Sequence, residues 1–309
     1  MKAIGIILAG GNNNRMKELT AKRAVPALPV AGSFRSIDFA LSSMSNSHIQ
    51  TVAVLTQYNA RSLNEHLSSS KWWNFGRKQG GLFLFTPTVT ADNSDWYRGT
   101  ADAMYQNIDF LKRRHEPYVI ISSGDWVYKL DFNRVLDFHI EKKSDITVVC
   151  KDMMYNDDVS RFGVVRMDDE SRITEFDEKP IEALSNTIST GIYVIRRRQL
   201  IELLEAAAEE NRFDFVNDIL VRYKNVKKIY GYKINSYWNN IADIDAYFKT
   251  NMDFLRPDIR SYFFREEPTI CSKVDDLPPA KFNPGSDISN SLVSSGCIIN
   301  GRVEDSVLF

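Results

Sequence analysis

Residues 6–15 read Ile-Ile-Leu-Ala-Gly-Gly-Asn-Asn-Asn-Arg, an apolar run that leads into paired glycines and then an arginine. The pattern is typical of a buried strand that brings its backbone to a phosphate group. Two adjacent glycines, Gly10 and Gly11, let main-chain N–H groups approach phosphate oxygens because no Cβ stands in the way. Arg15 then supplies a cation that can neutralise a triphosphate. The stretch therefore predicts a first β-strand followed by a nucleotide-binding loop.

Short β-rich runs alternate with amphipathic stretches along the first half of the chain. Strands are expected at 4–8, 51–55, 118–122 and 145–150, and helices at 36–47, 100–114 and 133–142. This alternation predicts an α/β fold with a mainly parallel sheet and helices on both faces. Because sites in such sheets gather at the carboxyl ends of strands, we expect Gly10-Gly11 and Gly124-Asp125 to meet at one crevice.

The second half of the chain predicts three segments with different patterns. Strands at 188–196 and 227–234 and helices at 199–210 and 243–255 complete a domain over 1–255. The stretch 256–289 is rich in proline, serine and aspartate and predicts a linker. Residues 290–309 carry short apolar pairs separated by Gly, Ser and Asn, which resembles the first coils of a parallel β-helix. We expect this pattern to be cut short at Phe309, since a solenoid needs about three coils; a two-strand appendage is the simpler alternative.

The composition excludes several classes of protein. The chain has 309 residues, 43% of them hydrophobic, and 39 basic against 40 acidic residues. Such a balance argues against a nucleic-acid partner or a general attraction to membranes, and no run approaches the roughly 20 apolar residues of a membrane span. The three cysteines are widely spaced without a C-x-x-C pair, so neither a disulfide framework nor a zinc site is indicated. A reduced, cytoplasmic setting fits best.

A series of short motifs runs through the chain in a characteristic order. They are Leu-Ala-Gly-Gly at 8–11, Lys-Arg-Ala at 22–24, Phe-Arg at 34–35, Ile-Asp-Phe at 37–39, Leu-Thr-Gln-Tyr at 55–58, Trp-Tyr-Arg-Gly-Thr-Ala at 96–101, Ser-Gly-Asp at 123–125, Glu-Lys-Pro at 178–180 and Leu-Pro-Pro-Ala-Lys at 277–281. Any one of them is a weak signal. Together they resemble the glucose-1-phosphate adenylyltransferase (ADP-glucose pyrophosphorylase) family over essentially the whole chain.

The resemblance implies a Rossmann-like, GT-A-like nucleotidyltransferase domain with a mainly parallel sheet, followed by the start of a left-handed parallel β-helix. It also implies a tetramer that acts in bacterial glycogen biosynthesis. In the family's reaction, a phosphate oxygen of glucose 1-phosphate attacks the α-phosphorus of ATP, which forms ADP-glucose and releases pyrophosphate. Catalysis of this kind depends on positioning and on neutralising charge with Mg²⁺ and basic side chains.

The resemblance also assigns residues of this chain to three groups. The catalytic residues would be Arg15, Asp125 and Lys179, with Asp125 as a Mg²⁺ ligand. The nucleotide would be bound by Leu8, Ala9, Gly10, Gly11, Arg15, Gly99, Thr100 and Ala101. The sugar phosphate would be bound by Glu178, Lys179, Ser189 and Gly191. Taken singly, the same residues fit plainer roles, such as paired glycines in a tight turn, an aspartate that caps a helix, or a solvated lysine.

Five departures from the family pattern share a direction, the loss of charge or of loop freedom. In four of them, Asn13 replaces a third glycine of the phosphate loop, Val25 a lysine, Trp126 a histidine, and Val216-Asn217 a Gly-Lys pair. Asn13 brings a side chain into space that phosphates would need. Val25 removes a cation that would face a phosphate. These changes predict weak turnover.

The fifth departure is Asn240, where the family has an aspartate that shares Mg²⁺ with the residue matched by Asp125. Mg²⁺ prefers hard anionic oxygens, so Asn240 offers a neutral carbonyl and not the second negative charge. Losing one preorganised electrostatic group costs about 10²- to 10³-fold in rate. Asp243 is an alternative ligand three residues further on, although its place before a predicted helix favours a capping role.

These departures favour a regulatory-type subunit that is weakly active or inactive alone. Its expected partner is a catalytic adenylyltransferase paralogue in a hetero-oligomer, or a second copy in a homo-oligomer, and its possible ligands are ATP, ADP-glucose and glucose 1-phosphate. The alternative is a slow but active adenylyltransferase that uses Mg²⁺ with Asp125, Arg15 and Lys179. A nucleotide-sugar sensor that acts alone is a third hypothesis.

Overall fold

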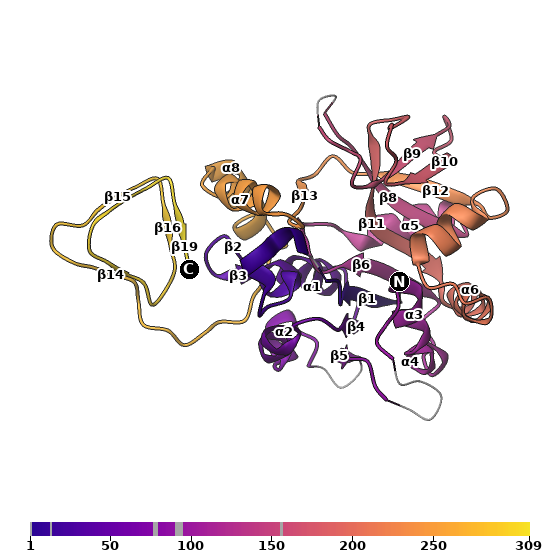
Figure 1. Ribbon diagram of the computed structural model, residues 1–309, viewed down its shortest axis with the longest axis horizontal. Helices are drawn as coiled ribbons and strands as arrows, with labels where there is room; N and C mark the ends of the chain where they lie inside the picture. Colours follow the sequence, from indigo (N-terminus) through magenta and orange to yellow (C-terminus); the bar gives the residue numbers. More distant parts are fainter. Residues whose placement is uncertain (1, 13, 77–79, 90–94, 155–156) are drawn as a thin grey trace.

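The computed structural model of the chain describes residues 2–12, 14–76, 80–89, 95–154 and 157–309 (Figure 1). Its main sheet has nine strands: β1 (Ala3–Ala9), β4 (Thr51–Thr56), β5 (Gly81–Phe85), β6 (Tyr118–Ser123), β8 (Ile146–Asp152), β9 (Gly163–Met167), β10 (Ile173–Glu178), β11 (Thr187–Arg196) and β12 (Ile229–Lys233). The helices are α1 (Ser36–Asn46), α2 (Arg61–Leu67), α3 (Thr100–Tyr105), α4 (Ile108–Lys112), α5 (Phe132–Glu141), α6 (Arg197–Glu209), α7 (Ile244–Asp253) and α8 (Pro257–Phe264).

The main sheet is mixed, with a parallel half around β1. Its order is β10-β9-β11-β6-β1-β4-β5, and β8 joins beside β11 and carries β12 on its other side. Strand β1 is parallel to β4 and β6, and β4 is parallel to β5. Strand β11 is antiparallel to β6, β8 and β9. The α/β prediction is confirmed, and the antiparallel strands lie in the second half of the chain, where the sequence pattern is less regular.

Helices cover both faces of the sheet because the apolar residues of its strands alternate. In β1, Ile7 belongs to a buried cluster with residues of α1, α2 and α5, whereas Ile4 and Ile6 belong to another with residues of α3, α4 and α6. Successive side chains of a strand point to opposite faces, so an unbroken apolar run serves two cores at once. Strand β1 is therefore packed between helices on both faces of the sheet.

The helix expected over 100–114 is two helices, α3 and α4. The Asn107 side chain donates a hydrogen bond to the Ala103 carbonyl, with 2.9 Å between Nδ2 and O, and another to the Tyr97 hydroxyl. The Ala103 carbonyl thus accepts from this side chain, whereas in a continuous helix it would accept from the Asn107 N–H. The prediction of a single helix is wrong for this reason.

Three elements lie inside the range 256–289 that we predicted as a linker: helix α8 and the short strands β14 (Lys281–Phe282) and β15 (Asp287–Ser289). Helix α8 begins at Pro257, which suits a first helical turn, and buries Phe263 in a cluster with Phe39 and Phe254. The chain after α8 also packs on the domain, since the Cys271 carbonyl accepts hydrogen bonds from Ser42 and from the indole of Trp73. The first part of the predicted linker is therefore attached to the main body.

The C-terminal segment forms three small parallel pairs of strands. They are β14 (Lys281–Phe282) with β17 (Ile298–Ile299), β15 (Asp287–Ser289) with β18 (Arg302–Glu304), and β16 (Leu292–Val293) with β19 (Val307–Leu308). In Figure 1 they trace a triangular outline beside strands β2 (Pro29–Val30) and β3 (Phe34–Arg35). The Ser33 and Ser294 hydroxyl oxygens lie 3.3 Å apart, which joins this segment to the turn between β2 and β3.

Candidate functional site

The expected meeting of two distant glycine-containing segments is confirmed at the carboxyl ends of β1 and β6. Leu8 pairs in register with Ser123, and the Gly124 N–H donates to the Leu8 carbonyl at 3.0 Å. The chain then leaves both strands on the same side, so that Gly10-Gly11 and Asp125 line one cavity. This is the edge of a parallel sheet where ligands bind.

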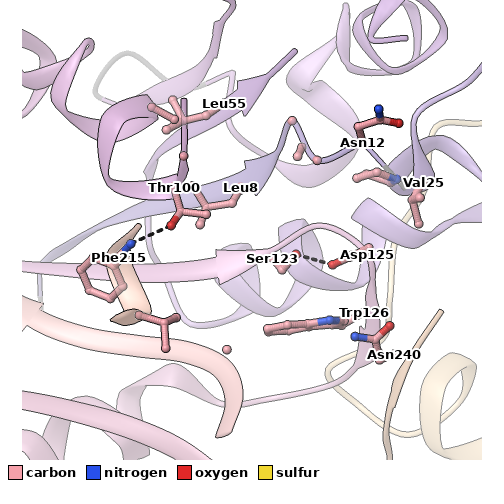
Figure 2. Close-up of a pocket in the computed structure, with 18 of the residues that line it drawn as sticks. Leu8, Asn12, Val25, Leu55, Thr100, Ser123, Asp125, Trp126, Phe215 and Asn240 are labelled. Atoms are coloured by element: carbon pink, nitrogen blue, oxygen red, sulfur yellow. Dashed lines mark hydrogen bonds between the residues drawn. The ribbon is translucent and has the colours of Figure 1, made fainter. Parts of the chain in front are cut away.

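The cavity has a volume of about 610 Å³, and Figure 2 shows residues that line it. Its lining includes most of the residues assigned from the sequence: Leu8, Ala9, Gly10, Gly11, Gly99, Thr100, Asp125, Glu178, Lys179, Ser189, Gly191 and Asn240. This size is within the range of small-molecule sites.

One end of the cavity is built around Thr100 and Gln57. The Thr100 hydroxyl accepts a hydrogen bond from the Phe215 N–H at 2.8 Å, as Figure 2 shows. Gln57 accepts from the Tyr97 N–H at 2.7 Å and donates back to its carbonyl at 3.3 Å. These bonds fix the backbone around Gly99, which approaches the Phe213 carbonyl so closely that a Cβ would overlap it. This end of the cavity is therefore rigid, with its polar atoms held by backbone partners.

Ala101, also assigned to the nucleotide, does not line the cavity. It is 1% exposed and packs with Met104 and Phe215 in the core on one face of the sheet. Its N–H donates to the Phe213 carbonyl at 2.8 Å. Ala101 thus supports the end of the cavity from beneath.

Arg15 lines an adjoining cavity of about 390 Å³ together with Arg161 and Lys179. The two cavities share several residues, among them Asn12, Lys179 and Asn240. The charged side chains that line this smaller cavity are all basic among the residues the structure describes. Such a surface attracts anions.

Asp125 lies just after the end of β6, and its carboxylate is partly buried. The Ser123 hydroxyl donates to its Oδ1 (Figure 2). Burial raises the pKa of the Asp125 carboxyl above its usual range, and the bond from Ser123 offsets part of that rise. The Ile241 N–H donates to the Asp125 carbonyl at 3.2 Å, which brings the segment around 240 to the same place.

Asn240 lies beside Asp125 because two short strands pair there. Strand β7 (Trp126–Tyr128) is antiparallel to β13 (Trp238–Asn240), with Trp126 opposite Asn240. The Asn240 Oδ1 atom accepts a hydrogen bond from the Ala242 N–H at 2.6 Å. The expectation that positions 125 and 240 converge is thus confirmed in space, although the amide oxygen is already used within the chain.

The residues at this edge do not form a complete Mg²⁺ site. Asp125 is one carboxylate, and the carbonyl oxygen of Asn240 is neutral and already bonded to a backbone N–H. In the described part of the chain, no group of three or more His, Cys, Asp or Glu is arranged to hold a metal ion. A cation here would depend on Asp125 and on the oxygens of a bound phosphate.

Three further departures lie along the cavity. Val25 lines the cavity but is buried in an apolar cluster with Met16, Val127 and Ile241. Trp126 lies beneath the Ser123–Asp125 segment in Figure 2, and Val216 lines the other end of the cavity. Asn13 lies outside the described residues.

Glu178 is the last residue of β10 and Lys179 follows it. The two side chains pair, with 3.2 Å between Oε1 and Nζ. Lys179 has a φ of 51°, which is uncommon for a residue other than glycine and directs its side chain toward the basic cavity. Burial raises the pKa of the Glu178 carboxyl, and Lys179 offsets part of that rise. Ser189 and Gly191 belong to β11, where the strand bulges.

Arg161 is a cavity residue that the sequence does not reveal. It lines both cavities and forms an ion pair with Asp243. Asp243 also accepts from the Ala246 N–H at 2.8 Å, which confirms the expected cap of helix α7. No local pattern marks Arg161, because its partner is 82 positions away in the chain.

Comparison with known proteins agrees with this geometry. Residues 4–256 match the family described as Nucleotidyl transferase. The chain is 40% identical over 309 residues to a glucose-1-phosphate adenylyltransferase of Clostridium acetobutylicum, which covers 99% of this chain and 81% of that protein. It is 38% identical to that of Clostridium novyi over the same shares, and 36% identical to that of Geobacillus stearothermophilus over 100% of this chain and 80% of the relative.

The chain belongs to the glucose-1-phosphate adenylyltransferase family. Membership extends across both the main sheet and the C-terminal strands, because the similarity covers the chain from end to end. Among the described residues, no helix is both long and apolar enough to cross a membrane.

Proposed function

We propose that this chain is a regulatory-type subunit of the family, with weak or no adenylyltransferase activity of its own, in glycogen biosynthesis. The observation that carries the proposal is the state of Asn240. Where a second carboxylate would help hold Mg²⁺, the chain has an amide whose oxygen already bonds to the Ala242 N–H. One missing electrostatic group of this kind lowers a rate by about 10²- to 10³-fold.

Val25 supports the same conclusion. It stands at the cavity with an aliphatic side chain that belongs to a buried apolar cluster with Met16 and Ile241. A lysine there would have to leave that cluster and extend into the cavity. The missing cation at position 25 and the missing anion at position 240 therefore affect the same reaction centre. Two groups that would stabilise the charge of the transition state are absent from it.

A binding role for the cavity is supported by what the chain retains. Gly10, Gly11 and the basic residues Arg15, Arg161 and Lys179 still surround space suited to a polyphosphate. The subunit would bind ATP, ADP-glucose or glucose 1-phosphate and change the activity of a catalytic paralogue in a hetero-oligomer. Such coupling requires that the ligand bind two states of the assembly with different affinities.

The C-terminal strands support assembly through a β-helix. Each of β14, β15 and β16 pairs in parallel with a strand about 15 residues further along the chain, as successive coils of a solenoid do. We propose that these pairs begin a left-handed β-helix that takes part in a tetramer. Size-exclusion chromatography with light scattering, on an equimolar mixture of this chain and its catalytic paralogue, should then give a mass above that of either chain alone. Separate elution of the two chains would contradict the proposed assembly.

The deciding experiment measures pyrophosphate release from ATP and glucose 1-phosphate with Mg²⁺. Three samples are compared: this chain, its catalytic paralogue, and the two mixed. Silence of this chain alone with a changed rate or affinity in the mixture supports a regulatory subunit. A rate near that of the paralogue from this chain alone, or a mixture that behaves as the sum of its parts, contradicts it.

A matched control assigns any turnover in the mixture to one chain. The paralogue carries Asn in place of the aspartate that matches Asp125, so it no longer supplies the reaction. Turnover that persists would come from this chain. That result would favour the second candidate, a slow adenylyltransferase, for which the retained Asp125, Arg15 and Lys179 are the supporting observation.

A further inference from the structure

The indole of Trp126 reaches from β7 across to β11. A Cβ built on Gly191 would overlap Cη2 of Trp126, so the far edge of the ring covers the open backbone of that glycine. Gly191 has a φ of 65° and lies at the bulge of β11 between Ser189 and Ile192. The ring therefore fills the space that the glycine would otherwise leave to a ligand.

Other aromatic rings hold the indole in this position. The Trp126 ring lies 5.6 Å from that of Trp238, which in turn makes an edge contact with Phe162 at 5.6 Å. Trp238 is buried, and Phe162 lines the cavity. The Nε1 atom of Trp126 is buried without a hydrogen-bond partner among the described residues. Packing alone fixes the ring, so it is an apolar wall rather than a polar contact for a ligand.

The polar groups near this wall are satisfied by one another. The Ser189 Oγ atom accepts from the Gly191 N–H at 3.3 Å and lies 3.4 Å from the Tyr193 hydroxyl. Glu178 pairs with Lys179. Hydroxyl and carboxylate groups of this kind are what a polyhydroxylated ligand would need, and here they have partners within the protein.

At the phosphate loop, by contrast, it is the backbone that is open. A Cβ built on Gly11 would meet no described residue within 4 Å, so the described part of the loop leaves room beside Gly11. The adjoining cavity is lined by Arg15, Arg161 and Lys179. One part of the site is thus open and basic, and the other is filled by an aromatic ring.

We propose that Trp126 is the specificity-determining residue of this cavity and that it selects a nucleoside polyphosphate over a nucleotide sugar or a sugar phosphate. The inference rests on the proposed function, since it narrows the ligand of the same site. The indole occupies a place that a hexose ring would share, while the space for phosphates remains. The regulatory signal read by this chain is then the nucleotide itself.

The test compares the affinities of the wild-type chain for ADP, ADP-glucose and glucose 1-phosphate by calorimetry, with and without Mg²⁺. We expect ADP to bind about tenfold more tightly than ADP-glucose, and glucose 1-phosphate to give no heat at millimolar concentration. Equal affinities for ADP and ADP-glucose, or the absence of ADP binding, would overturn the proposal.

Substitution of Trp126 then assigns the selectivity to its ring. Trp126→His should shift the ratio of the two affinities by about tenfold toward ADP-glucose, and Trp126→Phe by about threefold, because each ring leaves more space than an indole. Trp72→His is the matched control, a partly buried tryptophan that packs against the core. A shift in the other direction would show that the indole is a stacking platform for the sugar.

The two proposals fail separately. Should Trp126→His fail to fold, the wild-type ratio and Trp126→Phe still decide the role of the ring. If the chain shows the expected selectivity but leaves its paralogue unaffected, the regulatory function is wrong and the role of Trp126 stands. If it alters the paralogue but binds ADP-glucose as well as ADP, only the inference about Trp126 is wrong.

Discussion

The two ends of the cavity differ in how much open backbone they offer to a ligand. At the phosphate loop, no described residue lies within 4 Å of a Cβ built on Gly11, and basic side chains line the adjoining cavity. At the edge formed by β7 and β13, Asn240 bonds to the Ala242 N–H and Trp126 covers Gly191. The phosphate loop retains open backbone and basic residues that can bind an anion. At the other end, Asn240 and Trp126 make contacts within the protein.

This difference teaches that binding and catalysis are separable within one fold. Binding a polyphosphate needs open backbone N–H groups and cations, which the loop after β1 supplies as a consequence of the fold. Catalysis needs groups that become better bonded in the transition state, and position 240 offers a neutral amide in place of a negative charge. Under the proposed function, the changes at 25, 126 and 240 remove the reaction without removing the cavity.

The largest effect is expected from restoring the two missing charges at the reaction centre. Asn240→Asp together with Val25→Lys should raise pyrophosphate release by about 10²-fold, because each change returns an electrostatic group to the reaction centre. An aspartate at 240 keeps an oxygen for the Ala242 N–H, so the turn should persist. The measurement is the rate with saturating ATP, glucose 1-phosphate and Mg²⁺.

Asp125→Asn in the same background is the control, and it should return the rate to that of the unmodified chain. No gain from the double substitution would show that the loss of function extends beyond these two positions. Trp126 would then be the next position to change.

The second test separates the structural and binding roles of glycine at the nucleotide end. Gly99→Ala should lower the melting temperature by about 4 °C, since its Cβ would overlap the Phe213 carbonyl. The methyl group of Gly11→Ala would meet no neighbour among the described residues, so the melting temperature should stay unchanged. ATP binding should weaken about tenfold, because the methyl group enters the space of a phosphate. Thermal unfolding and calorimetry check the pair. Full ATP affinity in Gly11→Ala would place the phosphates elsewhere.

Much of this site follows from the sequence, and the rest depends on contacts between distant segments. The apolar run before Gly10 predicts a strand and a phosphate loop, and the spacing to Asp125 predicts a second strand that ends at the same edge. By contrast, Arg161 finds its ion-pair partner only after the fold forms, and the burial of Ala101 depends on how α3 packs. Local patterns report on local structure, whereas these features are set by tertiary packing.

Trp126 illustrates the same limit. The sequence shows a tryptophan in place of histidine, but not that its ring would reach Gly191 on an antiparallel strand. The direction of β11 and its bulge decide that contact. The break between α3 and α4 is similar, since it depends on the Asn107 side chain and its bond to the Tyr97 hydroxyl.

A third test uses the cost of burying Asp125. Because burial raises the pKa of this carboxyl, the folded chain binds its proton more readily than the unfolded chain, and this group makes the fold less stable as the pH rises through the folded-state pKa. Asp125→Asn should therefore raise the melting temperature near pH 7, and the gain should shrink as the pH falls toward about 4. A gain that is constant with pH would mean that the carboxylate is not penalised by burial.

The smallest expected effect concerns Asp243, which could serve either as a helix cap or as a replacement for the missing metal ligand. Asp243→Asn keeps an oxygen for the Ala246 N–H and removes the charge that pairs with Arg161, whereas Asp243→Ala removes both. If Asp243 acts as a cap, Asp243→Asn should cost little stability, whereas Asp243→Ala should lower the free energy of unfolding by about 1 kcal/mol. Neither change should alter the effect of Mg²⁺ on ATP affinity. If Asp243→Asn abolishes that effect while the fold remains intact, Asp243 supplies the second negative charge, and the edge formed by β7 and β13 has kept the chemistry that Asn240 lacks.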